Sequence, residues 1–328
     1  GMTADTSHHR KRIFLLGATG TIGRAVLTIL VDRGYDVVAF VRPSSISSVA
    51  DKGAEIRIGS VTDMQSIIQE GFRGEQFDVL VSCLASRNGA PDDAWKIDYQ
   101  ANLNALNAAK TSGVQHFVLL SAICVQKPQL AFQHAKLAFE KALIESGLTY
   151  SIVRPTAFFK SLSGQIERVR KGKPFLLFGN GEITRCKPIS DADLANYLAE
   201  CFVDPAMQNR ILPIGGPGNS ITPKEQGEIL YGLIGKEARF RQVPIRLLDT
   251  IVSVLDFVGR ILPAAKAKAE LARIGRYYAT ESMLVWNPET GAYDPAATPS
   301  TGTDTLQDHY KHLIDDTASI KRSDHSVF

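Results

Sequence analysis

The sequence predicts an α/β protein built on a doubly wound parallel sheet. Short apolar segments alternate with amphipathic segments of helical period over residues 12–155, which is typical of strands and helices in turn. Such alternation gives a parallel sheet with helices on both faces. A glycine-rich loop, GATGTIG (17–23), also joins the first apolar segment to the first amphipathic one, as a strand-to-helix phosphate loop does.

Six strands are expected, each a short apolar run bounded by polar residues or glycine. They are RIFLLG (12–17), DVVAFV (36–41), EIRIG (55–59), FDVLVSCLA (77–85), HFVLLSA (116–122) and TYSIVRP (149–155). Helices are expected between them, in TIGRAVLTILVDRG (21–34), DMQSIIQEGF (63–72), IDYQANLNALNAAKTSG (97–113) and the segment that carries Phe132 and Lys136. Right-handed crossovers turn this order into a Rossmann-type fold, which binds ligands beyond the carboxyl ends of its strands.

The alternation ends after residue 160, so a second region is expected. Residues 1–12 are expected to be a polar arm that begins with an expression remnant, and 13–160 the Rossmann domain. Residues 161–286 are expected to form a smaller substrate lobe, largely helical, with segments that complete the sheet. The tail 287–328 is rich in Pro, Thr, Asp and Gly and is expected to be extended.

Composition narrows the function classes. The 328 residues are 44% hydrophobic and carry a net charge of only +3, so a nucleic-acid partner is not expected. The four cysteines have no metal-ligand spacing, so no metal site is expected. They are expected to be reduced thiols in a cytoplasmic protein. No targeting peptide is expected. The most apolar stretch, residues 247–262, is too short for a membrane span and is broken by charges.

The glycine loop predicts a dinucleotide site. Gly17 permits the tight turn, Gly20 lets the backbone approach a pyrophosphate, and Gly23 lets the helix pack closely on the strand. The helix then offers free N–H groups and the positive end of its dipole to the phosphates. The loop residues expected to contact the cofactor are Gly17, Thr19, Gly20, Thr21, Ile22 and Gly23. A tight turn without a ligand is the alternative.

The second strand favours NADPH. An NAD site places a carboxylate at this strand end, whereas here the strand ends in Arg42 followed by Ser44. A guanidinium can pair with a 2′-phosphate; a plain surface arginine is the alternative. Further cofactor contacts are expected after the other strands, from Ser60, Val61, Cys83, Leu84, Ala85, Pro155 and Phe158, and from Lys136 on a helix.

Ser121 and Lys136 occupy the positions of a short-chain dehydrogenase site, but Phe132 stands where that site has tyrosine. A phenyl ring cannot supply a proton to a carbonyl oxygen. The chain is therefore either a cofactor-binding protein without catalysis or a reductase whose acceptor is not a carbonyl. A vinyl group conjugated to a large aromatic ring would need less help from a strong acid, and Phe132 would offer it an apolar wall. Core packing is the alternative for Phe132.

Several blocks resemble the divinyl chlorophyllide a 8-vinyl-reductases, an atypical short-chain dehydrogenase family. They include VSCLASRNGAPDDAWKIDYQANLNALNAAK, HFVLLSAICVQKPQLAFQHAKLAFEKAL and YSIVRPTAFFKSLSGQIERVRKGKPFLLFGNGEITRCKPISDADLA, and the resemblance runs from about residue 13 to 310. The family has phenylalanine at the position of Phe132. The resemblance implies NADPH-dependent reduction of an 8-vinyl group to ethyl in chlorophyll or bacteriochlorophyll biosynthesis, and a bacterial form without a transit peptide.

A site hypothesis follows. Lys136 holds the nicotinamide ribose, and the ring lies near Ser121 and Pro155. The proton comes from water, Lys136, Ser121 or Cys124, in that order of preference. The substrate-binding residues expected are Phe132, Phe158, Phe159, Arg154 and Lys160, where the aromatic rings meet the tetrapyrrole and the cations pair with its propionate. Core packing for the two phenylalanines and a structural ion pair for Arg154 are the alternatives.

Three questions stay open at this point. Residues 247–262 fit a pocket lid, a peripheral membrane contact or a buried core helix. An NADPH-sensing regulator of the same fold, or an NADPH reductase of another aromatic substrate, are rival functions. The oligomeric state, and the choice between chlorophyllide and protochlorophyllide, are not encoded in any recognisable pattern.

Overall fold

The computed structural model describes residues 10–326, with side chains up to Asp316. The chain forms two compact units. The first holds the chain up to Arg154 together with Leu194–Pro213, and the second holds Pro155–Asp193 together with the chain from Ile214 onward. Each unit is therefore built from two stretches of sequence, whereas the sequence predicted consecutive regions that meet at residues 160 and 286.

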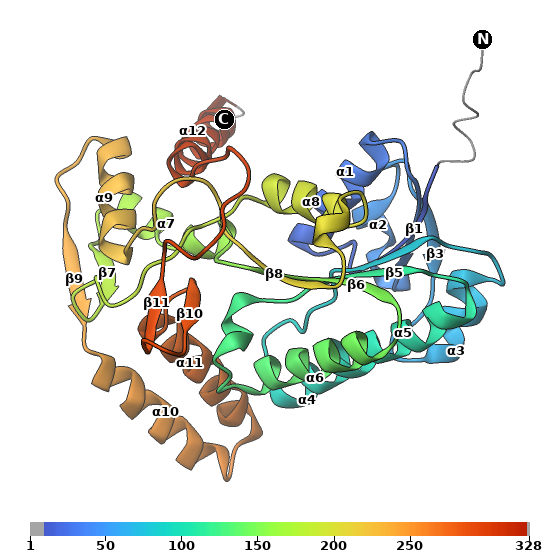
Figure 1. Ribbon diagram of the computed structural model, residues 1–328. Coiled ribbons are helices and arrows are strands. Elements are labelled where there is room, and N and C mark those ends of the chain that lie inside the picture. The colour runs from blue at the N-terminus through green and yellow to red at the C-terminus, as the bar shows by residue number, and fades with distance from the viewer. Residues whose placement is uncertain (1–9, 327–328) are drawn as a thin grey trace. The chain divides into compact units, whose positions relative to one another are not determined.

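A seven-stranded sheet forms the centre of the first unit, in the order β3-β2-β1-β4-β5-β6-β8 (Figure 1). The strands are β1 (Arg12–Leu16), β2 (Asp36–Val41), β3 (Glu55–Ile58), β4 (Val79–Ser82), β5 (His116–Leu120), β6 (Thr149–Pro155) and β8 (Arg210–Ile214). The pairs from β3 through β6 are parallel. All six predicted strands are present, and the doubly wound parallel sheet is confirmed.

Helices cover both faces of this sheet. Its helices are α1 (Thr21–Asp32), α2 (Ile46–Val49), α3 (Met64–Ser66), α4 (Pro91–Ala94), α5 (Asn102–Thr111), α6 (Ala131–Glu145) and α8 (Asp191–Glu200). Figure 1 shows α3–α6 on one face and α1, α2 and α8 on the other. Two π-helical segments, Ile67–Phe72 and Trp95–Ala101, extend α3 and join α4 to α5.

One core of the first unit lies between the sheet and α3–α6. It is largely aromatic and aliphatic: Phe14 stacks on Phe72 at 4.2 Å between ring centroids and meets Phe77 edge-on at 5.4 Å. The strands β1, β4 and β5 are apolar on both faces because helices cover both. This packing fixes the sheet edge on which the candidate site lies.

The second unit is largely helical, as predicted for the lobe of residues 161–286. Its elements are α7 (Ile166–Arg170), β7 (Phe175–Phe178), α9 (Pro223–Ile234), β9 (Phe240–Val243), α10 (Ile245–Gly259), α11 (Pro263–Thr280), β10 (Val285–Asn287), β11 (Ala292–Asp294) and α12 (Leu306–Ser326). β7 and β9 pair in parallel, and β10 and β11 form an antiparallel hairpin.

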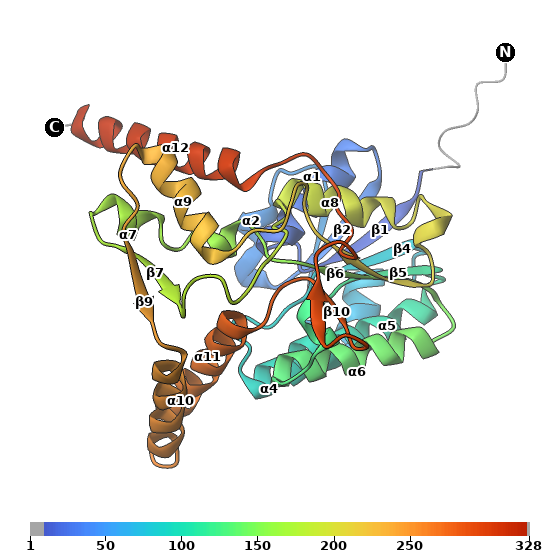
Figure 2. The ribbon, with the colours of Figure 1, turned by 60° about the vertical axis from the view of Figure 1, so that its left-hand side comes forward.

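The C-terminal region differs from the prediction of an extended tail. It ends in the long helix α12, which lies beside α9 (Figure 2). Leu306 and Tyr310 of α12 pack with Leu230 and Tyr231 of α9 in the core of the second unit. Pro, Thr and Gly do fill residues 295–303, but this composition ends before Leu306, where apolar residues resume at helical spacing. Among the residues described, no helix is long and apolar enough to cross a membrane.

Candidate cofactor and substrate site

The register of the sheet brings the predicted site residues of the first unit to one edge. Leu16 pairs with Phe40 and with Ser82, and Leu120 pairs with Val153. Because these strands are parallel, the residues that follow them all emerge at the carboxyl edge. Gly17, Arg42, Cys83, Ser121 and Arg154 are therefore neighbours along this edge, although they are far apart in the sequence.

The glycine loop has the geometry of a phosphate loop. Gly17 has a φ of +76° and lies so close to β4 that a side chain there would meet the carbonyl carbon of Cys83 at 2.4 Å. A Cβ at Gly23 would meet the carbonyl oxygen of Gly17 at 1.8 Å, so the loop folds back on the start of α1. A Cβ at Gly20 would meet only the Gly17 oxygen, at 3.7 Å, which is an ordinary contact.

The start of α1 can receive an anion. Gly20 caps this helix of 12 residues without a side chain, and no acidic residue lies in its first turn. The first N–H groups and the positive end of the helix dipole are therefore not offset by a carboxylate. The residues at this position fit the pyrophosphate of a dinucleotide, and the open side of Gly20 leaves room for it.

Arg42 extends from the end of β2 and is exposed, as is Ser44 after it. No ion pair of Arg42 with a carboxylate is recorded among the described residues. Next to them, Ser60 follows β3 with its hydroxyl 2.8 Å from that of Thr62, and the Val61 carbonyl accepts a hydrogen bond from Asn104. The arrangement offers a cation and hydroxyls to the adenosine end of a dinucleotide. No acidic residue stands at the end of β2, between Val41 and Ser45.

The loop after β4 begins buried and becomes exposed within three residues, through Cys83, Leu84 and Ala85. Burial raises the pKa of the Cys83 thiol to about 12, so Cys83 lines this edge as a neutral group and does not act as a nucleophile. Ser86 follows, and both its N–H and its hydroxyl donate to the carboxylate of Asp98.

Asp98 also binds Lys136. The ammonium group of Lys136 lies 3.1 Å from Oδ1 of Asp98, and the Asp98 side chain is only 1% exposed. Asp98 lies in the π-helical segment Trp95–Ala101, and Asn102 donates to its backbone carbonyl. Asn102 in turn accepts from Ser82 at the end of β4. A buried carboxylate thus ties the predicted ribose-binding lysine to the loop after β4.

Ser121 and Arg154 meet on a second buried carboxylate, that of Glu140 in α6. The Ser121 hydroxyl donates to Glu140 at 2.6 Å, and the Arg154 guanidinium makes two hydrogen bonds to it, at 2.5 and 3.2 Å. Arg154 was expected to bind a substrate propionate, with a structural ion pair as the alternative; its pair with Glu140 inside the first unit matches that alternative. Ser121 likewise has its hydroxyl hydrogen directed to Glu140.

Phe132 and Lys136 lie one turn apart on α6, as their spacing predicted. Phe132 is 9% exposed and Cys124 is 2% exposed, so only the ring of Phe132 retains a small accessible surface. The next residue, Gln133, is fully buried; its side-chain oxygen accepts from the N–H groups of Gln129 and Leu130, which fixes the start of α6. Its amide nitrogen has no recorded hydrogen-bond partner.

The remaining predicted substrate residues belong to the second unit. Phe159 is 3% exposed, packs in the core with Tyr231 and Leu306, and contacts the ring of His309. This position matches core packing, the alternative given for Phe159. Phe158 is half-buried and Lys160 is exposed, and both stay candidates. Pro155 ends β6.

The sequence analysis missed Asp98 and Glu140. A partial signal was present at Asp98, which lies between Ile97 and Tyr99, because a buried acid needs a partner. What the sequence lacked was the identity of that partner, since Lys136 and Arg154 are distant along the chain. Among the residues described, no group of three or more acidic, histidine or cysteine side chains could hold a metal ion.

Comparison with known proteins decides the family. A sequence model described as NAD(P)H-binding matches residues 17–205. The chain is 49% identical over 319 residues to the chloroplastic divinyl chlorophyllide a 8-vinyl-reductase of Arabidopsis thaliana. The aligned region covers 92% of this chain and 76% of that protein. It is 48% identical to the enzyme of Cucumis sativus, over 96% of this chain and 79% of that protein. The chain belongs to the divinyl chlorophyllide a 8-vinyl-reductase family.

A solved structure supports the fold independently of this family. The NADPH-dependent quinone oxidoreductase QOR2 of Escherichia coli, solved with NADPH, matches 92% of this chain and 99% of its own, with a TM-score of 0.69 and 20% identity. The Rossmann-type fold and the family expected from the sequence are therefore both confirmed.

Proposed function

We propose that this protein reduces the 8-vinyl group of divinyl chlorophyllide a, or of divinyl protochlorophyllide, to an ethyl group with NADPH. The observation that carries the proposal is family membership at 49% identity over nearly the whole chain. The site geometry supports it, because a glycine loop and a buried Asp98–Lys136 pair accompany a phenylalanine at the usual position of the acid tyrosine. A carbonyl reductase would need that tyrosine, whereas a vinyl reductase does not.

The chain's own residues bind and orient the cofactor. The first N–H groups of α1 bind the pyrophosphate, and Arg42 binds the 2′-phosphate with help from Ser44. Lys136, held by Asp98, donates a hydrogen bond to the nicotinamide ribose. When bound there, NADPH would supply the hydride for the terminal vinyl carbon, and a proton would complete the ethyl group at the carbon next to the macrocycle.

The proton source is Lys136 or a water that it orders. Ser121 is a poor donor, because its hydroxyl hydrogen is already shared with the Glu140 carboxylate at 2.6 Å. Glu140 and Arg154 act as positioning residues that hold the end of β5 in place beside the end of β6. Phe132 provides an apolar surface for the flat substrate, and Phe158 and Lys160 of the second unit are the remaining substrate candidates.

The decisive experiment is anaerobic incubation of the purified protein with divinyl chlorophyllide a and either NADPH or NADH. The expected product is heavier by two hydrogens at the 8-vinyl group, and it is expected with NADPH in preference to NADH. Chromatography coupled to mass spectrometry measures it. NADPH binding with unchanged pigment would overturn the proposal and favour a cofactor-sensing protein of the same fold.

A further inference from the structure

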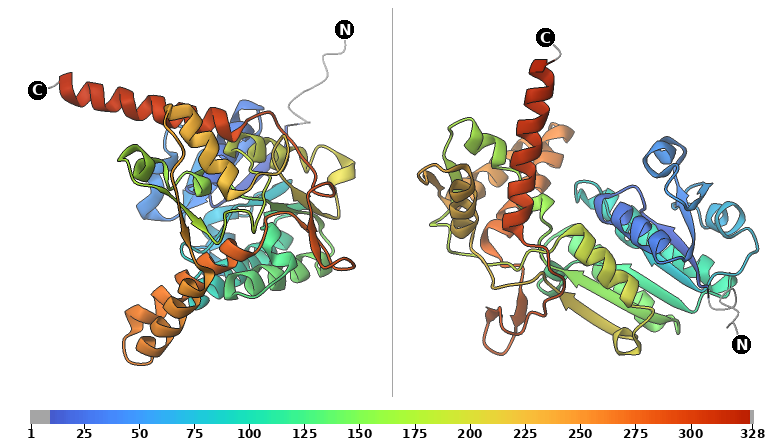
Figure 3. Two further views of the ribbon diagram at one scale, coloured as in Figure 1. Left: turned by 90° about the vertical axis from the view of Figure 1, so that its left-hand side faces the viewer. Right: turned by 90° about the horizontal axis from the view of Figure 1, so that it is seen from above.

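The helices α10 and α11 form a hairpin whose apolar residues are exposed. Figure 3 shows it extending away from the rest of the second unit. No residue of α10 is buried. Its half-buried residues, among them Leu248, Val252 and Leu255, recur at helical spacing and form the face that packs on α11. The helix carries a second row of apolar residues, which does not belong to this face.

The second stripe faces solvent. We call it the outer stripe; it consists of Leu247, Ile251, Val254, Phe257, Ile261 and Leu262. Its exposure increases toward the hairpin tip, where Phe257 is 66%, Ile261 79% and Leu262 56% exposed. Gly259 allows the sharp tip, because a Cβ there would meet the backbone of Lys266 at 3.1 Å. Large apolar side chains this exposed at a projecting tip indicate an interaction surface.

The acidic residues of α10 are paired with α11, whereas the tip of the hairpin carries only basic residues. Asp249 and Asp256 of α10 both pair with arginines of α11, Arg276 and Arg273, so the acids lie on the side of α10 that faces α11. From Phe257 to Ala269 there is no acidic residue. That segment carries Arg260, Lys266 and Lys268, and all three are exposed.

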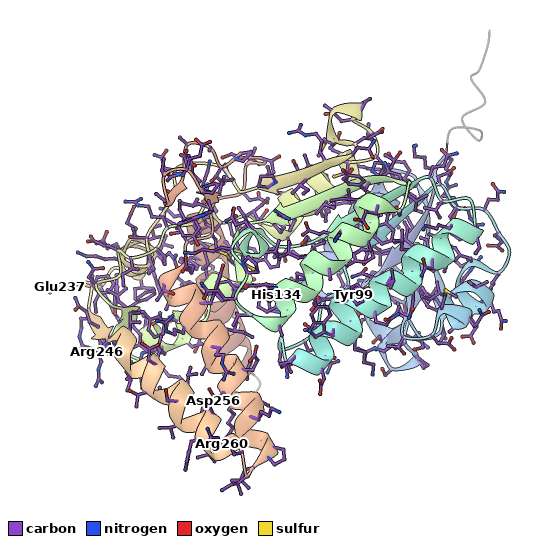
Figure 4. The ribbon with its side chains drawn as sticks, turned by 60° about the horizontal axis from the view of Figure 1, so that its bottom comes forward. Tyr99, His134, Glu237, Arg246, Asp256 and Arg260 are labelled. Carbon is purple, nitrogen blue, oxygen red and sulfur yellow. The ribbon has the colours of Figure 1, made fainter. Side chains whose placement is uncertain are left out.

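Two arginines border the outer stripe at its two ends. Arg246 lies near the start of α10 and Arg260 just after its end, as labelled in Figure 4. The guanidinium of Arg260 lies 5.8 Å from the ring centroid of Phe257, so the cation and the aromatic ring project together. Aromatic and aliphatic side chains bordered by cations match a bilayer interface, where rings enter the acyl boundary and cations meet anionic headgroups.

We propose that the α10–α11 hairpin binds the surface of a bilayer that contains anionic lipids, with Phe257, Ile261 and Leu262 inserted at the interface. Arg246, Arg260, Lys266 and Lys268 contact the lipid phosphates. A second copy of this chain fits the surface less well, because two cationic tips would repel each other. The proposal does not depend on the reaction, and the test below involves no pigment, so the two can fail separately.

The test is co-sedimentation of the purified full-length protein with vesicles of phosphatidylcholine alone or of phosphatidylcholine with phosphatidylglycerol. Binding is expected to the anionic vesicles and to weaken as salt rises. The apolar variant Phe257→Asp/Ile261→Asp and the charge variant Arg260→Glu/Lys266→Glu/Lys268→Glu are each expected to bind roughly tenfold or more weakly, since each cation contributes measurably at an anionic surface. Thermal melting shows whether each variant is folded.

Matched controls change exposed residues of the same types in the first unit. Ile144→Asp/Val203→Asp removes two exposed apolar side chains, and Lys52→Glu/Lys110→Glu/Lys141→Glu reverses three exposed cations. Both are expected to bind vesicles like the unchanged protein. Absence of vesicle binding by the unchanged protein, or equal loss in the controls, overturns the proposal. A concentration-dependent dimer that Phe257→Asp/Ile261→Asp abolishes also overturns it and makes the outer stripe a contact between copies.

Discussion

Among single residues, Lys136 and Asp98 form the most informative pair in the candidate site. Lys136→Met is expected to raise the KM for NADPH and remove most of the turnover. Asp98→Asn should have a smaller effect in the same direction, because it leaves the ammonium group but releases it from the loop after β4. Steady-state kinetics measures both.

The double variant distinguishes a shared role from two separate ones. If Asp98 acts by positioning Lys136, Lys136→Met/Asp98→Asn should be barely worse than Lys136→Met alone, since residues in one network are not additive. Additive losses would mean that Asp98 acts elsewhere, for example through Ser86 alone.

Arg42 decides the choice of cofactor in our proposal. Arg42→Ala should raise the KM for NADPH by roughly 10- to 100-fold, the equivalent of losing a charged hydrogen bond. The KM for NADH should stay nearly unchanged, because NADH has no 2′-phosphate. An equal change for both cofactors would show that Arg42 supports the fold of the β2 end and does not bind phosphate.

Gly20 separates ligand binding from loop geometry. Gly20→Ala should fold with normal stability, since its new Cβ meets only one protein atom at 3.7 Å. The same Cβ would lie where the pyrophosphate approaches, so the affinity for NADPH should fall at least tenfold. Gly23→Ala is the contrasting variant: its Cβ would collide with the Gly17 oxygen, and both stability and binding should be lost. Titration by fluorescence together with thermal melting distinguishes the two.

At the scale of elements, α6 is fixed against the ends of β5 and β6 by Glu140. Glu140→Gln leaves the Arg154 guanidinium without a balancing charge in a buried position. Removing one partner of such a pair typically costs about 3–5 kcal/mol. The exposed residue Glu145 lies on the same helix, so Glu145→Gln should change the free energy of unfolding by less than about 0.5 kcal/mol. Urea unfolding measures both; equal effects would contradict a structural role for the Glu140 carboxylate.

The π-helical segment Trp95–Ala101 is the second element that the site depends on. A π-helical turn shifts the residues that follow by about one position around the helix relative to a regular α-helix, and such turns are frequent at functional sites. Here Asn102 satisfies the carbonyl of Asp98 and is itself held by Ser82. The carboxylate of Asp98 is thereby directed to both Ser86 and Lys136.

For the whole molecule, stability should depend on pH through His116 in β5. Burial, and secondarily the positive charge of Lys11, lowers the pKa of His116 from 6.5 to about 4. The unfolded chain therefore binds a proton below pH 6.5 that the folded protein does not accept until about pH 4. Stability should fall as the pH drops through this window, by up to about 3 kcal/mol in total.

The measurement is the free energy of unfolding by urea at pH 7 and pH 5, with His116→Gln as the comparison. Glutamine keeps a hydrogen-bonding group near Ser151, the present partner of His116, but cannot titrate. The variant should lose less stability between the two pH values than the unchanged protein. Equal losses would assign the pH dependence to other groups, such as His309, whose pKa burial also lowers.

The amino-acid sequence by itself determined the order of strands and helices up to residue 155, because apolar periodicity and glycine loops depend on neighbours along the chain. It also determined the family, through long blocks of residues and the phenylalanine at position 132. The cofactor edge followed from these, since parallel strands must align their carboxyl ends.

Only the tertiary structure decided which charges are balanced and which are available. Arg154 was predicted as a substrate ligand, but Glu140 binds it; Phe159 was predicted at the substrate, but it packs in a core. The helix α12 was likewise not predicted. For Arg154 and Phe159 the deciding contact is with a different element of the fold, and local pattern carries no information about such partners. Tertiary packing also decided the exposure of the outer stripe. The sequence predicted an amphipathic helix, and only one of its two apolar stripes is covered by α11.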